Sequence, residues 1–190
     1  MRATTSRGSR PRALRNAAEI MRRVLVIGSP GAGKSTLATR FAAKLGVPVH
    51  YLDRQHWGPG WIYRDGAMAR EAVRALSETP EWVMDGNFAE SFDLRMPRAD
   101  TLVWLDYPRA TCIRRILARA IKDYGKQKAD MPEGCPEGFD IGVLRFAWDF
   151  PTVSRRQIAP AIERFGQHLQ VFQLRNDRDV SDFCRAQGLA

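Results

Sequence analysis

The sequence predicts an α/β fold in which a parallel sheet is covered by helices on both faces. Short and almost continuously apolar runs, the pattern of strands buried on both faces, recur along the chain. Helical patterns separate most of these runs, and strands that alternate with helices favour parallel pairing. A chain of 190 residues can bury a sizeable core in one such domain. The predicted strands span residues 24–27, 49–52, 82–84, 101–105 and 169–174.

The helices between these strands are predicted from apolar residues three and four positions apart. The first ends at Gly46, a residue that readily adopts the left-handed conformation at a helix C-terminus. Glycines, prolines and charges fill residues 123–140, a composition typical of a mobile loop. After it we expect a short helix that ends at Pro151, and a further helix with Pro160 near its start or at a kink. The earlier helices span residues 37–45, 68–76 and 113–121.

A glycine-rich motif joins the first strand to the first helix. Residues 28–35 fit the pattern G-x-x-x-x-G-K-[ST], in which glycines with positive φ let backbone N–H groups point inward at phosphate oxygens. Lys34 can reach the β- and γ-phosphates, Ser35 can ligate Mg²⁺, and the helix directs its positive dipole end at the anion. The flanking strand and helix favour a nucleoside triphosphate site over a chance glycine-rich turn. The expected nucleotide-binding residues are Gly28, Ser29, Pro30, Gly31, Ala32, Gly33, Lys34, Ser35 and Thr36.

Two of the predicted strands lead into an acidic residue, Asp53 and Asp85. Ligands of an open parallel sheet bind at the carboxyl ends of its strands, where Gly28 also lies. One acid can hold the hydration shell of Mg²⁺ and the other can orient or deprotonate an acceptor hydroxyl, the two tasks that phosphoryl transfer requires. Each could instead cap a helix or turn. Asp106, which precedes Tyr107 at the end of another strand, is interpreted mainly as a cap.

Basic residues cluster where a lid would close over this site. Arg115, Arg119 and Lys122 lie opposite the apolar stripe of their helix, and Lys126 and Lys128 follow in the loop. Such a run usually forms a solvated helix face. Because this helix leads into a Gly- and Pro-rich segment, we favour a lid whose cations stabilise a transferring phosphoryl group.

Aromatic residues follow Asp53 closely. Trp57, Trp61 and Tyr63 could stack on the ring of an acceptor, or they could pack the loop that holds them. The sequence favours neither interpretation.

The net charge of +9 and the pI of about 10.1 raise the question of a nucleic-acid partner. Five arginines against Glu19 give residues 1–20 a net charge of +4, so the rest of the chain carries +5. That remainder is ordinary for a domain that binds polyphosphates. We interpret residues 1–20 as a flexible basic tail, or as the result of a start assigned too early, and less readily as a transit peptide. DNA is therefore a candidate partner of this tail.

The remaining composition signals exclude several classes of protein. The three cysteines are scattered without C-x-x-C spacing and the three histidines form no ligand pattern, so we expect reduced intracellular thiols and no His or Cys metal centre. No apolar segment approaches the roughly 18 residues of a membrane-spanning helix. We expect a cytoplasmic protein, monomeric or homodimeric, with residues 21–190 as its one domain.

The motifs also occur in a characteristic order. GSPGAGKST is followed by WVMDGN, LRMPRADTLVWLDYPR, KADMPEGCPEGFD and FAWDFP. Over residues 21–189 this order resembles the small adenylate-kinase-like P-loop proteins often labelled topology modulation proteins. The resemblance implies a P-loop NTPase fold of the nucleoside- and nucleotide-kinase type, with three layers, a parallel five-stranded sheet in the order 2-3-1-4-5, and a lid over residues 123–140.

The resemblance implies roles for individual residues. Asp85 and the glycine after it resemble the Asp-Gly that holds the Mg²⁺ site of adenylate kinases, and Asp53 resembles the substrate-side Asp of shikimate-kinase-like enzymes. The segment LRNDRDV, which contains Arg175, would lie beside the adenine. Asn87 stands where adenylate kinases have Phe-Pro-Arg, and Lys128 stands where the similar proteins have Arg. Both departures argue against AMP as the acceptor.

We therefore expect an ATP- and Mg²⁺-dependent kinase that transfers the γ-phosphate of ATP to a nucleotide, a nucleoside or a small hydroxyl metabolite. The alternative is a nucleotide-dependent DNA-binding regulator without phosphotransfer, a role that the family label implies and no motif explains. A GTPase is disfavoured because RNDRD differs from N-K-x-D, the sequence with which such proteins recognise guanine. A motor ATPase is disfavoured because no apolar strand ends in an Asp-Glu pair. The expected catalytic residues are Lys34, Asp53, Asp85, Arg115 and Arg119, with Ser35 and Asp85 at the metal.

Overall fold

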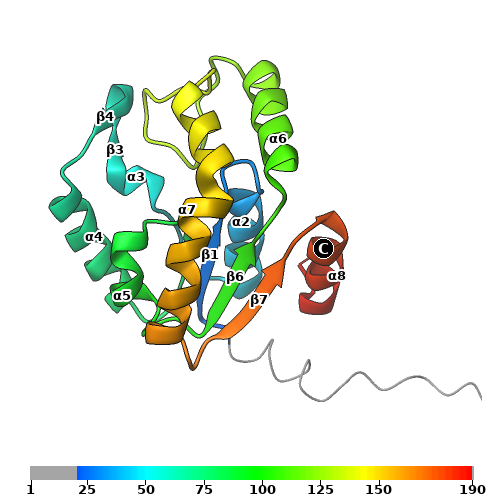
Figure 1. The fold of residues 1–190 in the computed structure, drawn as a ribbon. Coiled ribbons are helices and arrows are strands. Elements are labelled where there is room, and N and C mark those ends of the chain that lie inside the picture. Colours follow the sequence, from blue (N-terminus) through cyan, green and yellow to red (C-terminus); the bar gives the residue numbers. More distant parts are fainter. Residues whose placement is uncertain (1–20, 190) are drawn as a thin grey trace, which may run out of the picture.

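Five parallel strands form the central sheet of the computed structural model, which describes residues 21–189 (Figure 1). These strands are β1 (Arg23–Gly28), β2 (Val49–Tyr51), β5 (Trp82–Asp85), β6 (Thr101–Leu105) and β7 (Gln170–Leu174). They lie in the order β2-β5-β1-β6-β7, with every neighbouring pair parallel. Counted along the chain within this sheet, the order is 2-3-1-4-5. The predicted α/β fold and its strand order are confirmed.

Helices cover both faces of this sheet (Figure 1). They are α2 (Lys34–Leu45), α4 (Gly66–Glu78), α5 (Phe92–Arg95), α6 (Arg109–Lys122), α7 (Ile141–Phe165) and α8 (Asp177–Gln187). The side chains of β1 alternate between two cores: Val24 and Val26 pack in one with α2 and α8, while Leu25 and Ile27 pack in the other with α4, α5 and α7. This alternation confirms the predicted three layers, and it explains why the strands read as unbroken apolar runs.

Helix α7 differs from the two helices that the sequence predicts in this region. It runs without interruption through both Pro151 and Pro160, so the expected break at Pro151 is wrong. The Asp140 side chain begins the helix by accepting hydrogen bonds from two backbone N–H groups of the first turn. Buried residues recur every three or four positions across both prolines. Packing of that face on the sheet offsets the backbone hydrogen bonds that the prolines remove.

Several short elements occupy stretches without a periodic pattern. A helical turn, α3 (Asp53–His56), leads into a hairpin of β3 (Trp57–Gly58) and β4 (Ile62–Tyr63), whose connection is the 3-10 turn η1 (Pro59–Trp61). A second 3-10 turn, η2 (Ala89–Ser91), precedes α5. Elements of two to four residues are too short to show a helical or strand period, which is why the sequence did not indicate them.

Residues 123–140 form the predicted loop between α6 and α7, and an isolated bridge folds this segment back on itself. The loop packs on the β3–β4 hairpin. The Gly60 N–H donates to the Gly134 carbonyl oxygen over 3.2 Å, and the buried Cys135 thiol donates to the Gly58 carbonyl oxygen over 3.2 Å. We call residues 123–140 the lid segment. It is thereby fixed to the hairpin that follows Asp53.

Two expectations concern the chain as a whole. Among the described residues, no helix is long and apolar enough to cross a membrane. Cys112, Cys135 and Cys184 are free and buried. The predicted basic tail, residues 1–20, lies outside the described residues.

Candidate active site

The glycine-rich motif forms a loop between β1 and α2, as the sequence predicts. We call residues 28–33 the phosphate loop, after the role that the sequence predicts for them. Gly28, Gly31 and Gly33 all have positive φ, of 150°, 77° and 94°. A Cβ on Gly28 would lie 2.5 Å from the Leu105 carbonyl oxygen of β6, and one on Gly31 would collide with the Cys112 carbonyl oxygen of α6. Glycine therefore lets the loop lie against both elements while its backbone turns inward.

Lys34 and Ser35 begin α2 at the mouth of this loop. Gly33 occupies the N-cap position and no side chain caps the helix, so the first N–H groups of α2 are not occupied by a capping side chain. The Lys34 ammonium folds back and donates to the Ser29 carbonyl oxygen over 3.2 Å. A helix N-terminus, a lysine and a curled backbone thus meet where an anion can bind.

Asp85 ends β5 beside this loop. Its side chain is only 5% exposed, and its Oδ1 has no hydrogen-bond partner among the described residues. Burial raises the pKa of the Asp85 carboxyl to about 6, against the lowering effects of Lys34 and Ser35. None of the α-helices among the described residues has Asp85 at its N-cap, so a helix-capping role is not supported. A buried carboxylate oxygen without a partner costs free energy, and it is suited to a ligand that brings a positive charge.

The oxygens of Asp85 and Ser35 fit Mg²⁺. This ion prefers oxygen ligands, and one or two protein groups usually hold it together with substrate phosphates and water. The part of the chain that the structure describes contains no cluster of three or more His, Cys, Asp and Glu side chains that could hold a metal alone.

Asp53 lies at the end of the neighbouring strand, β2, as the first residue of α3. Its side chain is exposed and makes no capping hydrogen bond; Leu52 holds the N-cap position. The negative charge of Asp53 contributes to the raised pKa of the Asp85 carboxyl. A hydrogen bond of 2.8 Å from the Leu52 N–H to the Asp85 carbonyl oxygen ties the two strand ends together.

The aromatic residues of the β3–β4 hairpin pack on one another. The Trp57 ring meets those of Trp61 and Tyr63 edge to face, with centroids 5.7 Å and 5.4 Å away. His56 lies edge-on to Phe88, with centroids 4.0 Å apart. These contacts favour the packing interpretation over a platform held open for an acceptor ring.

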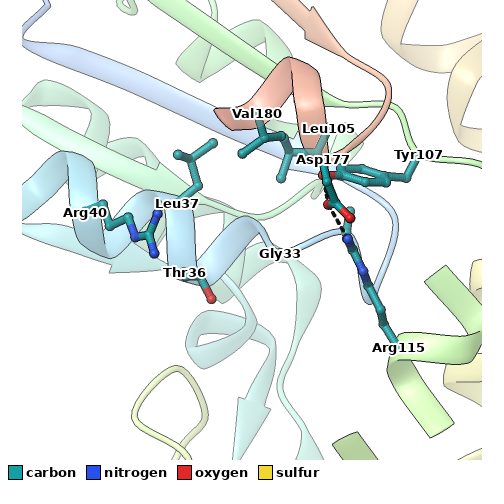
Figure 2. Close-up of a pocket in the computed structure, with 10 residues that line it drawn as sticks. Gly33, Thr36, Leu37, Arg40, Leu105, Tyr107, Arg115, Asp177 and Val180 are labelled. Atoms are coloured by element: carbon teal, nitrogen blue, oxygen red, sulfur yellow. Dashed lines mark hydrogen bonds and ion pairs between the residues drawn. The ribbon is translucent and has the colours of Figure 1, made fainter. Parts of the chain in front are cut away.

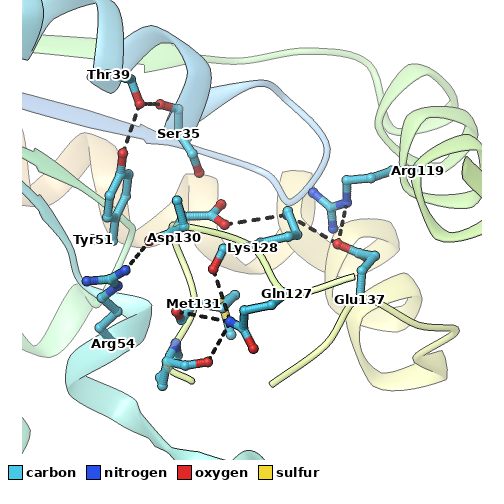
Figure 3. A network of polar contacts seen from close by, with 12 residues as sticks. Ser35, Thr39, Tyr51, Arg54, Arg119, Gln127, Lys128, Asp130, Met131 and Glu137 are labelled. Carbon is cyan, nitrogen blue, oxygen red and sulfur yellow. Dashed lines mark hydrogen bonds and ion pairs between the residues drawn. The ribbon is translucent and has the colours of Figure 1, made fainter. Parts of the chain in front are cut away.

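The lid segment brings two predicted cations to one carboxylate (Figure 3). Glu137 Oε2 lies 3.0 Å from Arg119 Nε and 3.2 Å from Lys128 Nζ, and the Glu137 side chain is 9% exposed. Lys128 Nζ also lies 3.7 Å from Asp130 Oδ1. The charge of Asp130 contributes to the raised pKa of Asp85, so this part of the lid segment lies near the phosphate loop. By contrast, Lys122 and Lys126 are exposed, as in a solvated face.

A pocket of about 190 Å³ opens on the α6 and α8 side of the phosphate loop (Figure 2). Arg115 lines this pocket and is not part of the Glu137 cluster: its guanidinium lies 4.5 Å from the Tyr107 ring centroid and pairs with Asp177. The Tyr107 hydroxyl donates to the same carboxylate over 2.7 Å, and burial raises the pKa of Tyr107 to about 12. The other walls include Gly33, Thr36, Leu37, Arg40, Leu105 and Val180.

Arg175 belongs to the segment expected beside the adenine, and its guanidinium donates to Gln173 Oε1 over 3.2 Å. Asp177 and Val180 of the same segment line the pocket. One predicted side-chain role, that of Asp106, needs correction. Asp106 is not a cap. It is buried and accepts hydrogen bonds from Arg155 and from Gln173 Nε2, so it joins α7 to the end of the sheet.

Sequence reasoning missed the roles of three residues. Tyr107 and Asp177 hold Arg115 in the pocket, and Glu137 holds the lid cations. No signal in the sequence singles out Glu137, because residues 123–140 contain five acids against two lysines. Tyr107 and Asp177 lie 70 positions apart, and only the fold brings them together.

Two solved structures are similar to this one. A shikimate kinase from Acinetobacter baumannii in complex with shikimate has a TM-score of 0.53 and 14% sequence identity, covering 91% of this chain and 97% of that chain. A shikimate kinase from Bacteroides thetaiotaomicron has a TM-score of 0.46 and 24% identity, covering 89% and 98%. At such identities a likeness shows the P-loop kinase-like fold alone. No curated protein matches the chain.

The sequence also matches a protein family over residues 24–133, more than half of the chain. The matched stretch begins in β1 and contains the phosphate loop, both carboxylates, the whole of α6 and the first part of the lid segment. The chain therefore belongs to the AAA_18 family, described as an AAA domain.

Proposed function

We propose that this chain is an ATP-dependent phosphotransferase that moves the γ-phosphate of ATP to a hydroxyl of a small acceptor bound at Asp53. The observation that carries the proposal is the meeting of the phosphate loop, Asp85 and Asp53 at the ends of three adjacent strands, β1, β5 and β2. The P-loop kinase-like fold supports it. The lid cations Arg119 and Lys128 complete the groups that phosphoryl transfer requires.

The triphosphate would bind along the phosphate loop. Backbone N–H groups and the α2 N-terminus would face its oxygens, and Lys34 would leave the Ser29 carbonyl to contact the β- and γ-phosphates. Arg119 and Lys128 would approach the γ-phosphate from the lid side. Cations fixed around the transferring group stabilise the charge of the transition state, and they do so most strongly once water is excluded.

Asp85 and Ser35 would hold Mg²⁺ against the β- and γ-phosphates. When bound, the ion neutralises phosphate charge and orients the triphosphate for in-line transfer. Asp85 is prepared for this role because its Oδ1 has no partner among the described residues.

Asp53 would orient the acceptor hydroxyl and take its proton. As the hydroxyl oxygen bonds to the γ-phosphorus, the bond between that phosphorus and the β,γ-bridging oxygen breaks and ADP leaves. The proton passes to the Asp53 carboxylate. The exposure of Asp53 leaves it open to an acceptor. The lid segment lies beside it, because the guanidinium of Arg54, the next residue, donates a hydrogen bond to the Ala129 carbonyl oxygen.

The nucleotide base would occupy the pocket on the other side of the loop. Arg115 offers a flat guanidinium face there, held by Tyr107 and Asp177, and Val180 offers an apolar wall. Planar cations stack well on aromatic rings. The predicted catalytic role of Arg115 thus becomes, in this proposal, a role in holding the base.

The acceptor is proposed to be a small hydroxyl metabolite or a nucleoside rather than AMP. The Acinetobacter structure of similar fold is a shikimate kinase in complex with shikimate. Asn87 replaces the segment that adenylate kinases have at this place, and its side chain bonds to the phosphate loop instead of facing an acceptor.

The test is ATP turnover against a panel of nucleotides, nucleosides and small hydroxyl metabolites that includes shikimate, followed by ³¹P NMR of the products. We expect one class of acceptor to raise ADP release well above hydrolysis, and Lys34→Ala to abolish this while the protein remains folded. Absence of transfer to every acceptor, with retained turnover in Lys34→Ala, would overturn the proposal.

A further inference from the structure

The β1–β5 pairing ends before the phosphate loop begins. On the β6 side, β1 stays paired through Gly28, which lies opposite Leu105. On the β5 side the last paired residues are Val26 and Asp85, and the Gly86 N–H then donates to the Val26 carbonyl oxygen over 3.1 Å. The next rung of this ladder would use the N–H and C=O of Gly28. Beyond Asp85, however, β5 has no further strand residue to supply it.

The Asn87 side chain supplies this missing rung. Its Oδ1 accepts from the Gly28 N–H over 3.0 Å, and its Nδ2 donates to the Gly28 carbonyl oxygen over 2.8 Å. A side-chain amide has the same donor and acceptor as a peptide group, so it continues the ladder without continuing the strand. The first glycine of the phosphate loop is thereby fixed to a residue two positions after Asp85.

A buried arginine fixes the other side of the same turn. Arg95 has no exposed surface, and its guanidinium donates to the carbonyl oxygens of Gly86, Asn87 and Phe88, while its Nε donates to Ser91 Oγ over 2.8 Å. Three carbonyls held by one planar group leave the backbone at Asn87 little freedom. The positive φ of Phe88, 29°, shows that this turn is held in an uncommon conformation.

We propose that Asn87 is a positioning residue that sets the distance between the phosphate loop and Asp85, and so couples Mg²⁺ binding to ATP binding. This inference rests on the proposed function. Asp85 lies at the end of one strand and Ser35 follows the loop of the next, so an ion that bridges both needs those two strand ends in fixed register. The two hydrogen bonds of the Asn87 side chain join the turn after Asp85 to the first glycine of the loop.

The experiment measures the affinity of ATP in Mg²⁺ and in EDTA for the full chain and for Asn87→Ala, by calorimetry. We expect the ratio of the two affinities to fall roughly tenfold in Asn87→Ala, with the affinity in EDTA changing much less. Asn87→Asp keeps the acceptor for the Gly28 N–H and loses the donor to the Gly28 carbonyl oxygen, so the ratio of affinities should fall by less than in Asn87→Ala. This second variant allows the same comparison if Asn87→Ala does not fold.

Two comparisons separate positioning from a general loss of stability. Ser77→Ala removes a buried hydroxyl that donates to the Val73 carbonyl oxygen within α4, away from the site, and should lower the unfolding temperature without changing the ratio. In a double-mutant cycle, Asn87→Ala should have little further effect on the ratio once Asp85→Asn is present, because it acts through Asp85.

A ratio unchanged in Asn87→Ala, or additive effects in the cycle, would overturn the positioning role while leaving the proposed function intact. A wild-type protein that failed to bind ATP, or that bound it equally in Mg²⁺ and EDTA, would overturn the proposed function and this inference together.

Discussion

Asp85 is the residue at which the stability of the fold and the proposed function oppose each other. Its carboxylate is buried at the end of β5, where burial raises its pKa to about 6. Ionisation of the Asp85 carboxyl is therefore less favourable in the folded, ligand-free protein than in the unfolded chain. The Oδ1 of Asp85, which has no hydrogen-bond partner within residues 21–189, is the atom proposed to face a phosphate-bound cation.

Asp85→Asn should therefore stabilise the ligand-free protein at neutral pH. Because the folded-state pKa lies above the ordinary value, the folded protein binds more protons between about pH 4 and pH 6, and its stability falls as the pH rises through that window. The neutral amide of Asp85→Asn does not lose stability in this way. Its free energy of unfolding should exceed that of the wild type by up to about 3 kcal/mol above pH 6, and the gain should vanish below pH 4. Urea unfolding across this range measures the difference, and a constant difference at all pH values would contradict the explanation.

The two carboxylates should differ in their effect on the reaction. Asp85→Asn removes a charge near the metal, so the loss should appear with every acceptor and in acceptor-independent ATP hydrolysis. Asp53→Asn should abolish transfer, by about 100-fold or more, while ATP still binds and is slowly hydrolysed, because acceptor positioning and proton acceptance fail and the phosphate loop is intact. ATP affinity, hydrolysis and transfer are measured for both variants. Equal losses of all three would mean that neither carboxylate has the role proposed for it.

Among the elements, the lid segment has an electrostatic conflict of its own. Glu137 is held in place by its backbone, since its N–H donates to the Lys126 carbonyl oxygen over 2.9 Å and its carbonyl oxygen accepts from Gly125 over 2.8 Å. Its carboxylate forms ion pairs with Arg119 and Lys128, the two cations that are proposed to bind the γ-phosphate. The triphosphate and Glu137 would compete for the same two charges.

Glu137→Gln should strengthen ATP binding several-fold, because both cations become available without a change of side-chain shape. The matched control is Glu133→Gln, which removes the same charge from an exposed position of the same segment and should change ATP affinity little. Affinity is measured at two salt concentrations, and the gain should shrink at the higher one. Weaker binding in Glu137→Gln would show that Glu137 orients the cations and does not compete with phosphate.

The sequence predicts those helices and strands whose burial requires a regular apolar pattern. It does not predict turns whose backbone conformation depends on the hydrogen bonds of a single side chain. The side chains of β1 alternate between two cores, so the strand is apolar throughout and can be recognised from the sequence. The glycines of the phosphate loop can be recognised as well, because only glycine adopts their φ without strain. Pro151 suggested a helix end because its local cost is visible in sequence, whereas the packing of α7 that offsets it is not. In the sequence Asn87 stood out only as a departure from the adenylate-kinase pattern and Arg95 did not stand out, because their backbone contacts exist only in the folded turn.

For the whole molecule, the carboxyl ends of the strands are proposed to bind ATP, whereas part of the net charge is proposed to favour DNA. The groups proposed for phosphoryl transfer lie at the carboxyl ends of the strands, in the lid segment and, for Arg119, in the last part of α6. The charge is divided otherwise: residues 1–20 contribute +4 of the net +9 and lie outside the described residues. ATP chemistry and any contact with nucleic acid should therefore be separable by truncation.

Deletion of residues 1–20 should leave ATP turnover unchanged and weaken non-specific binding to duplex DNA. Every DNA phosphate that the protein no longer neutralises lowers the slope of log affinity against log salt by about 0.9, so removal of the tail should reduce that slope by up to about 4. The measurement is DNA binding of both forms at several salt concentrations, with ATP turnover as the control for folding. Because the +5 left on the rest of the chain is expected to serve polyphosphate ligands, the shortened protein should show no preference among DNA sequences. Sequence-selective binding that survived the deletion would instead favour the nucleotide-dependent regulator over the kinase.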